Sequence, residues 1–212
     1  MQDMIKISLK ENSYVVLKAI PGHFITPNSH VNYYLDMTTI KSRLSEASAA
    51  AKEISRMIEA TTIVDTIVCM DGCEIIGAYL AEELSKAGII SINYHKTIYI
   101  TTPEVASTGQ FLFRDNIQPM IKGKNVLLLM ASATTGQTII KATQALRYYG
   151  ANISGISAVF SAANSSMGIP IKSLFTIKDI PDYKAYAPEG CSMCRDKKVI
   201  DAFANAFGYS SI

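Results

Sequence analysis

The hexapeptide Ala133-Thr134-Thr135-Gly136-Gln137-Thr138 has the residue types of an anion-binding turn. Its small side chains leave the backbone N–H groups accessible, and its threonine hydroxyls add further hydrogen-bond donors. A helix is expected to begin near Gln137, where free N–H groups and the helix dipole favour a negatively charged ligand. The same residues also fit an ordinary turn between a strand and a helix, capped by Thr134 or Thr135. Residue types alone leave both interpretations open.

The cysteines form a second set of reactive side chains. Cys191 and Cys194 have the Cys-x-x-Cys spacing of a metal-binding pair, but a structural zinc site needs four ligands. Cys69 and Cys73 could complete such a set only if the C-terminal tail folded over the sheet. A disulfide and plain reduced thiols are the alternatives, and zinc is not expected.

Rings near the N-terminus could contact a base. His23 and His30 flank a turn, and local hydrogen bonding is the favoured interpretation for both. Tyr33 and Tyr34 could stack on a base, but only one of them can face a pocket if this segment is a strand. Tyr34 is kept as the candidate.

The anion-binding turn needs a strand before it and a helix after it, and the flanking sequence predicts both. Asn125–Met130 is an apolar run of strand length, and apolar residues recur at helical spacing over Gln137–Gly150. A strand over Ile63–Cys69 and a helix over Cys73–Ala87 repeat the pattern upstream. Buried strands linked by helices indicate an α/β fold with a doubly wound, mainly parallel sheet. Ligands bind at the carboxyl ends of such strands, so Asp71-Gly72-Cys73 is expected on the same rim as the turn.

The remaining segments complete this expectation. Before the core, the predictions are a helical or mixed start over residues 1–20, a strand over Val31–Asp36 and a long helix over Thr38–Ala60. Next come a strand or hairpin over Ile89–Thr101, a loop over Thr102–Gly109 and a short strand over Phe111–Phe113. The last predicted elements are strands over Ile153–Phe160 and Ile169–Ile177, and a short amphipathic helix over Asp196–Phe207. The loop is a candidate lid, although an unremarkable surface loop is an equal alternative.

The composition limits the classes of function. The 212 residues are 49% hydrophobic and 18% charged, so a sizeable core is expected. The net charge of +2 argues neither for nor against nucleic acid, no basic block stands out, and no nucleic-acid partner is expected. No apolar stretch reaches about 18 residues and no signal peptide is recognised, so we expect no membrane association and a cytoplasmic location. The predicted division is an N-terminal hood or helical segment (1–60), a core (61–178) and a C-terminal tail (179–212).

The segment VLLLMASATTGQTIIKATQALRYYGANISGISAVFS resembles the signature region of the type I phosphoribosyltransferases. That signature has a hydrophobic strand, two acidic residues, two variable residues and Thr-Thr-Gly-x-Thr, and TTGQT reproduces its last part in register. The N-terminal PGHFITPNSHVNYYLDM is similar to the opening of orotate phosphoribosyltransferases, and SLFTI followed by Cys-x-x-Cys is similar to one branch of them. The resemblance runs from about residue 20 to 195. It implies the family's fold, with the N-terminal segment and the C-terminal tail forming a hood.

The family transfers ribose 5-phosphate from phosphoribosyl pyrophosphate (PRPP) to a nitrogenous base, with Mg²⁺ and loss of pyrophosphate. The resemblance implies that residues 133–138 hold the 5′-phosphate, that Asp71, Gly72 and Cys73 form the pyrophosphate loop, and that Lys96 is a remaining cation near the lid. The family's two acids, which bind the ribose and organise Mg²⁺, are replaced by Met130 and Ala131. Neither residue can ligate a hard cation, which prefers oxygen.

Other positions depart from the family pattern as well. Asp71 and Glu74 add negative charge where a pyrophosphate should lie. Residues 97–109 contain no basic residue, so this lid cannot easily stabilise a departing pyrophosphate. The turn at Thr26–Ser29 lacks the lysine of the orotate enzymes.

These departures favour a phosphoribosyltransferase-like protein that binds a ribose 5-phosphate or nucleotide phosphate, with catalysis impaired or lost. The alternative is an active Mg²⁺-dependent transferase of orotate or purine type, with its acidic contacts moved to Asp71 or Asp36. A third class is a structural or oligomerisation role with an empty site. The expected partner is a phosphorylated small molecule such as PRPP or a nucleotide, or a nucleobase. Family analogy suggests a homodimer, and Mg²⁺ is expected only if the chain is an active enzyme.

Overall fold

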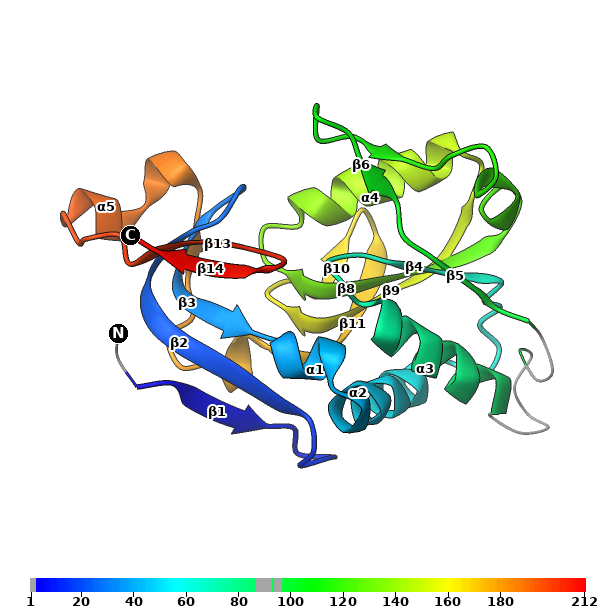
Figure 1. The fold of residues 1–212 in the computed structure, drawn as a ribbon, viewed down its shortest axis with the longest axis horizontal. Helices are drawn as coiled ribbons and strands as arrows, with labels where there is room; N and C mark the ends of the chain where they lie inside the picture. Colours follow the sequence, from blue (N-terminus) through cyan, green and yellow to red (C-terminus); the bar gives the residue numbers. More distant parts are fainter. Residues whose placement is uncertain (1–2, 87–92, 94–96) are drawn as a thin grey trace.

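The computed structural model describes residues 3–86, 93 and 97–212, and Figure 1 shows them arranged around a central sheet with a second sheet beside it. The central sheet has the spatial order β10-β11-β9-β8-β4-β5, and its neighbouring strands are parallel except for the β10–β11 pair. Its strands are β4 (Thr66–Cys69), β5 (Tyr99–Thr101), β8 (Asn125–Ala133), β9 (Asn152–Ser161), β10 (Ser165–Ser166) and β11 (Ile169–Thr176). The predicted doubly wound, mainly parallel sheet is confirmed.

Strand β8 is buried on both faces because helices cover both sides of the sheet. The helices α1 (Thr38–Ser42), α2 (Leu44–Met57) and α3 (Glu74–Lys86) lie on one side, and α4 (Gln137–Tyr148) lies on the other (Figure 1). Successive side chains of a strand point to opposite faces. Leu127 and Leu129 therefore join the hydrophobic cluster of α2 and α3, whereas Leu128 and Met130 join the cluster of α4. This two-sided burial explains the unbroken apolar run in the sequence.

The second sheet, which we call the hood, joins the two ends of the chain as predicted. Its strands run in the order β12-β3-β2-β13-β14, and β1 also pairs with β2. They are β1 (Ile5–Ser8), β2 (Val16–Ile25), β3 (His30–Asp36), β12 (Ala185–Tyr186), β13 (Ala202–Asn205) and β14 (Gly208–Ser211). A small apolar cluster between β2, β3 and β13 is formed by Phe24, Val31, Ala202 and Ala204. In Figure 1 the β13–β14 hairpin, drawn in red, extends from the hood towards the end of β8.

The helix predicted near the C-terminus is wrong, and the helical or mixed start contains strands. The helical character expected over residues 1–20 is replaced by β1 and the first part of β2, and the predicted helix over Asp196–Phe207 is replaced by the hairpin. In β13 the buried Ala202 and Ala204 alternate with exposed Phe203, which is the period of a strand. The apolar spacing of AFANAF fits both periods. The edge of β2, which is far away in sequence, decides between them by pairing with Ala202 and Phe203.

Most other predicted elements are confirmed within a few residues. The long helix over Thr38–Ala60 is divided into α1 and α2 at Arg43, which has extended backbone angles. Helix α2, assigned by prediction to the N-terminal segment, packs against α3 in the layer over the central sheet. Part of Ile89–Thr101 lies outside the described residues, and β5 forms its end.

The predicted loop over Thr102–Gly109 belongs to a small hairpin. In it, β6 (Glu104–Val105) pairs with β7 (Phe111–Leu112). The short strand predicted over Phe111–Phe113 is therefore confirmed as β7. The other short elements are η1 (Gln118–Met120), η2 (Ile177–Asp179), η3 (Pro188–Gly190) and α5 (Ser192–Arg195). Within the described part of the chain, no helix has the length and apolar character needed to cross a membrane.

Candidate functional site

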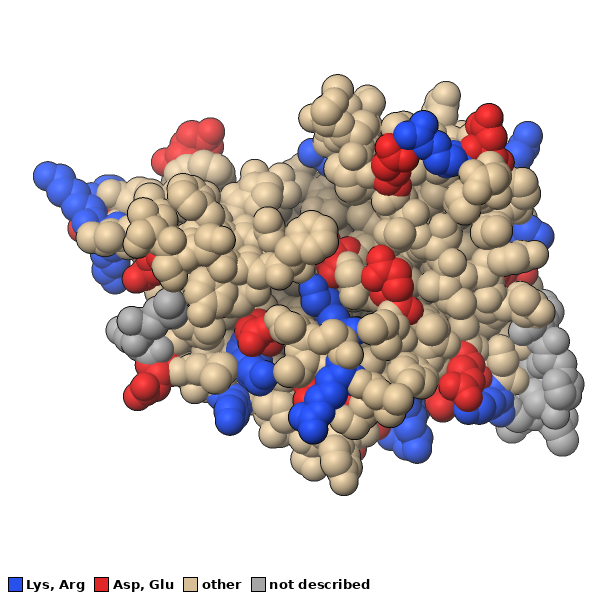
Figure 2. Space-filling model, in the orientation of Figure 1, with Lys and Arg blue, Asp and Glu red and all other residues tan. Residues whose placement is uncertain are grey.

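A cavity of about 320 Å³ lies between the hood and the carboxyl end of the parallel sheet. Its wall is built from β3, α1, the turns after β2 and β4, the end of β8 with the turn that follows it, and the turn between β13 and β14. Figure 2 shows the surface hollowed between the hood and the core, with basic and acidic side chains interspersed around the hollow. This position agrees with the rule that ligands bind beyond the carboxyl ends of parallel strands.

The predicted phosphate-binding turn forms one wall of the cavity. The residues of this turn that line it are Ala133, Thr134, Thr135, Gly136 and Thr138, whereas Gln137 is exposed. Gly136 has a φ of 76° and occupies the N-cap position of α4, and no side chain caps this helix. Capping by Thr134 or Thr135 is therefore wrong. The N–H groups of the first helical turn have no side-chain acceptor, and an anion in the cavity can take that place.

Two further positions that reach the cavity are those where the family that this chain resembles carries its acidic pair. Met130 and Ala131 both line it, and their side chains are 0% and 5% exposed. Met130 packs into the apolar cluster that contains Ile139 of α4. Neither side chain offers an oxygen, so the loss of both acids applies to the folded site as well as to the sequence.

The turn after β4 supplies a carboxylate at the same place. Asp71 and Gly72 have φ values of 58° and 77°, and this left-handed pair turns the Asp71 side chain towards β8. The backbone N–H groups of Ala131 and Ser132 lie close enough to its carboxyl to lower the pKa of that group, and Asp71 lines the cavity. Cys73 is fully buried in the core instead. Of the predicted pyrophosphate loop, Asp71 is the residue that reaches the site.

Sequence analysis missed the cation of this site. Lys41 of α1 lines the cavity, and its Nζ donates to the carbonyl oxygens of Asp71 (2.8 Å) and Ala206 (2.7 Å). It thereby ties the turn after β4 to the turn of the β13–β14 hairpin. Among the described residues that line the cavity, Lys41 is the only lysine or arginine. No local pattern marks it, because its partners lie 30 and 165 positions away.

The remaining predicted ligand contacts have different outcomes. Both Tyr33 and Tyr34 line the cavity, although they belong to different apolar clusters, so the expectation that only one would reach it is wrong. Tyr34 packs against Tyr209 with ring centroids 4.9 Å apart and ring planes tilted by 57°. Burial, together with Asp36 and Tyr209, raises the pKa of the Tyr34 hydroxyl. Asp36 accepts a hydrogen bond from the N–H of Thr38 and is not among the lining residues. The candidate Lys96 lies outside the described residues.

The environment of Asp71 leads to a prediction for stability. Burial is the main reason why the pKa of Asp71 is raised; Glu74 adds to the rise, and Lys41 with the N–H groups of Ala131 and Ser132 opposes it. Because the folded state holds this proton more tightly than the unfolded chain does, ionisation of Asp71 destabilises the fold as the pH rises above its ordinary pKa. The stability of Asp71→Asn relative to the wild type should therefore increase from about pH 4 to about pH 7. Urea unfolding of both proteins across this range measures the difference, and a difference that is constant or falls with pH contradicts the assignment.

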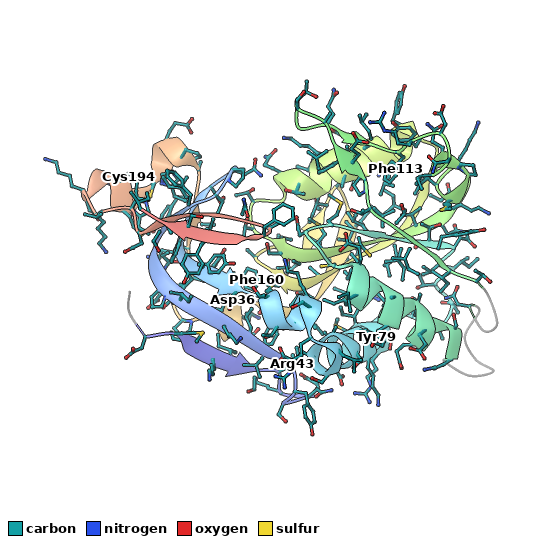
Figure 3. The ribbon with its side chains drawn as sticks, in the orientation of Figure 1. Asp36, Arg43, Tyr79, Phe113, Phe160 and Cys194 are labelled. Carbon is teal, nitrogen blue, oxygen red and sulfur yellow. The ribbon has the colours of Figure 1, made fainter. Side chains whose placement is uncertain are left out.

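The four side chains His23, His30, Cys191 and Cys194 come together outside the cavity. Their ligand atoms all lie within 4.8 Å of one another. The zinc ligand set considered from the sequence is wrong, since Cys69 and Cys73 belong to the core cluster beneath the central sheet. The reason for not expecting zinc, a shortage of ligands, is removed by the two histidines. In Figure 3, Cys194 lies at the outer end of the hood, at the opposite side of the molecule from Phe113.

Comparisons with known proteins identify relatives of the chain. It is 30% identical over 140 residues to the orotate phosphoribosyltransferase of Pyrococcus horikoshii, covering 65% of this chain and 69% of the relative. It is 24% identical over 186 residues to the enzyme of the same name from Chlorobaculum parvum, covering 86% and 87%. No family model matches the chain.

Solved structures of the same kind share the fold. A phosphoribosyltransferase from Corynebacterium diphtheriae superposes with a TM-score of 0.53 at 16% identity, covering 76% of this chain and 90% of that one. The UMP synthase of Leishmania donovani gives a TM-score of 0.55 at 15% identity and covers 76% of this chain, which spans 34% of that longer protein. At these identities the likeness concerns the fold alone.

Proposed function

Because the chain belongs to the type I phosphoribosyltransferase family, among its orotate phosphoribosyltransferase-like members, we propose that its cavity binds a ribose 5-phosphate carried by PRPP or a nucleotide, with transfer catalysis impaired or lost. The observation that carries the proposal is the uncapped helix N-terminus at Gly136, which opens into a cavity where Met130 and Ala131 stand in place of carboxylates. The turn supports phosphate binding, and the two apolar residues argue against catalysis.

The phosphate part of the ligand has donors on one side of the cavity. The backbone N–H groups at the start of α4 carry the positive end of the helix dipole, and the Thr134, Thr135 and Thr138 side chains line the same wall. These groups are arranged before the ligand arrives, because the left-handed Gly136 sets the path of the backbone. A 5′-phosphate placed there would direct the rest of the ligand towards Tyr34 and the hood.

The catalytic part of the family's site is poorly matched by the residues present. Among the described residues that line the cavity, Asp71 is the only aspartate or glutamate, and its carboxyl faces the backbone N–H groups of Ala131 and Ser132. Mg²⁺ demands several oxygen ligands, so this donor set does not fit a resident magnesium ion. The described residues of the β6–β7 hairpin, which contains the predicted lid, do not line the cavity. Lys41 is left to balance the charge of a departing pyrophosphate.

A second function, an active transferase with a relocated acid, is favoured by one specific observation. The Asp71 carboxyl lies against the backbone of Ala131 and Ser132, next to the position where the family carries its acids. If Asp71 bound the ribose hydroxyls during transfer, Asp71→Asn should lower turnover by roughly 100-fold, in the range known for removal of one group that stabilises a transition state.

Two measurements on the same protein test these alternatives. Calorimetry and thermal shift with ribose 5-phosphate, PRPP and nucleotides, with and without Mg²⁺, report binding. Pyrophosphate release from PRPP across a panel of bases that includes orotate and purines reports catalysis. Binding without release supports the proposal, whereas turnover with any base that is lost in Asp71→Asn supports the transferase. If none of the phosphorylated ligands binds, both functions are excluded.

The finer expectations from the family stay part of this proposal. A homodimer and a cytoplasmic location are expected by analogy. Light scattering of the purified protein tests the dimer directly.

A further inference from the structure

Four side chains that commonly bind metals converge on one point at the outer end of the hood. His23 is carried by β2 and His30 by β3, whereas Cys191 directly precedes the single turn of α5 and Cys194 lies within it. The nitrogen atoms His23 Nε2 and His30 Nδ1 are 3.2 Å apart. Cys194 Sγ lies 3.2 Å from His30 Nδ1 and 3.6 Å from His23 Nε2, and Cys191 Sγ lies 3.7 Å from His23 Nε2.

These separations match the edges of a tetrahedron around one zinc ion. Zinc binds histidine nitrogen at about 2.0–2.1 Å and cysteine sulfur at about 2.3 Å, so tetrahedral ligands lie about 3.3 Å apart for two nitrogens and about 3.6 Å apart for nitrogen and sulfur. The observed values of 3.2 Å for N···N and 3.2–3.7 Å for N···S agree within about 0.4 Å. A [2Fe–2S] centre with two histidines and two cysteines would hold each pair on a different iron atom and so separate the nitrogens from the sulfurs.

Hydrogen bonds within the cluster do not account for this arrangement. His23 Nδ1 lies 3.1 Å from the carbonyl oxygen of Lys198, which can only accept, so Nδ1 carries the proton and Nε2 presents a lone pair. His30 Nδ1 and both sulfur atoms converge on this single lone pair. One cation satisfies all four groups at once, and the Lys198 carbonyl is the usual second partner of a metal-binding histidine.

Burial and charge point the same way. His23, His30 and Cys191 are buried, at 2%, 9% and 3% exposure. Two thiolates and two neutral imidazoles balance the charge of a divalent cation. A tetrahedral S₂N₂ donor set is typical of Zn²⁺.

We propose that His23, His30, Cys191 and Cys194 bind one structural Zn²⁺ ion that anchors the C-terminal segment to the hood. Binding displaces the two thiol protons to solvent, leaves both histidines neutral and changes no oxidation state. The ligands join strands near residue 30 to a turn near residue 191, and such a closure of a long loop stabilises a fold chiefly by restricting the unfolded chain.

The segment that this ion would anchor reaches the cavity. Strand β13 is held to β2 through the pairs Ala202–Phe24 and Phe203–Ile25, and β14 pairs with β13 alone. The turn between them contributes Asn205, Ala206 and Phe207 to the cavity wall. Loss of the ion should therefore free the hairpin and weaken ligand binding several-fold. This last effect rests on the proposed function, whereas the metal site does not.

Metal analysis of the full chain, purified without a metal-affinity tag, tests the site directly. We expect about one zinc per chain by elemental analysis and native mass spectrometry. Cobalt exchanged into the protein should give the intense visible absorption of a tetrahedral, thiolate-bound ion. The variants Cys194→Ser and His30→Ala should lose the metal, and Cys69→Ala, which removes a buried thiol of the parallel sheet, should retain it.

Stability measurements keep the test decisive if a variant fails to fold. Removal of the metal from the wild type with a strong chelator should lower its Tm by roughly 10 °C, and added Zn²⁺ should restore it. A protein that is free of metal as purified, and whose Tm responds to neither Zn²⁺ nor Co²⁺, overturns the proposal. Full zinc content in Cys194→Ser also overturns it. If zinc is bound but ribose 5-phosphate affinity is the same with and without it, the metal site stands and the coupling to the cavity is refuted.

Discussion

Replacing Gly136 with aspartate should lower the affinity for ribose 5-phosphate and for PRPP by at least about 100-fold. The new carboxylate would stand at the N-terminus of α4, where the N–H groups are proposed to hold the phosphate. Two like charges about 4 Å apart near a protein surface repel by about 4 kcal/mol, and about 2.7 kcal/mol already corresponds to 100-fold in affinity. Calorimetric titration of the variant measures the loss.

Gly123→Asp is the matched control for this change. Gly123 also has a positive φ, 70° against 76° for Gly136, and an added Cβ would meet no atom within 4 Å at either position. The backbone strain and the change in charge are therefore similar, and aspartate tolerates this conformation better than most residues. Gly123 precedes β8, at the end of the strand away from the cavity. Equal affinity losses in the two variants, or none in Gly136→Asp, would show that the turn does not bind the phosphate.

The second large effect is expected for Lys41→Met. This substitution removes the positive charge beside Asp71 and keeps most of the side-chain volume. A hydrogen bond to a charged group contributes about 1.5–3 kcal/mol, so the affinity for PRPP should fall about 10- to 100-fold. Because Lys41 lies at the turn after β4 rather than at Gly136, the affinity for ribose 5-phosphate should fall less. Parallel titrations with the two ligands measure this selectivity.

Lys141→Met controls for the loss of one positive charge. Lys141 is exposed on α4, the helix that carries the phosphate turn, and it is not among the lining residues. Its substitution should leave both affinities nearly unchanged, since exposed charges are screened by salt. Unaltered PRPP affinity in Lys41→Met would contradict the placement of the pyrophosphate beside Asp71.

The two expected effects separate the halves of the proposed ligand. Gly136→Asp should weaken binding of every 5′-phosphate, whereas Lys41→Met should discriminate between a ligand with a pyrophosphate and one without. Neither variant touches the cluster at the outer end of the hood, so zinc content is expected to be unchanged in both. Metal analysis of these variants therefore shows that a loss of ligand affinity in them does not arise from loss of the metal.

The central sheet and half of the site were predictable because their signals are local. The apolar run of β8, the small residues of the turn and the helical period of α4 lie within 24 consecutive residues, from Asn125 to Tyr148. A strand buried on both faces must be apolar throughout, and a close turn before a helix needs glycine where φ is positive. The same stretch of sequence also shows that Met130 and Ala131 replace the acidic pair.

The hood and its hairpin were not predictable in this way. The segment AFANAF is compatible with a helix and with a strand, and the pairing edge of β2 decides between them. Edge pairing joins residues about 180 positions apart, which no window of sequence contains. The break of the long helix at Arg43 likewise has no strong local marker such as proline or glycine.

By itself, the sequence determined the parallel α/β core, the small-residue turn at Thr134–Thr138 before α4 and the absence of the acidic pair, because each depends on neighbouring residues. Only the tertiary structure decided which distant residues meet. It brought Asp71 against the backbone of Ala131, placed Lys41 between two turns and gathered His23 and His30 around the Cys-x-x-Cys pair. Each of these contacts joins segments separated by 30 or more positions, and their meeting is set by how the sheets and helices pack.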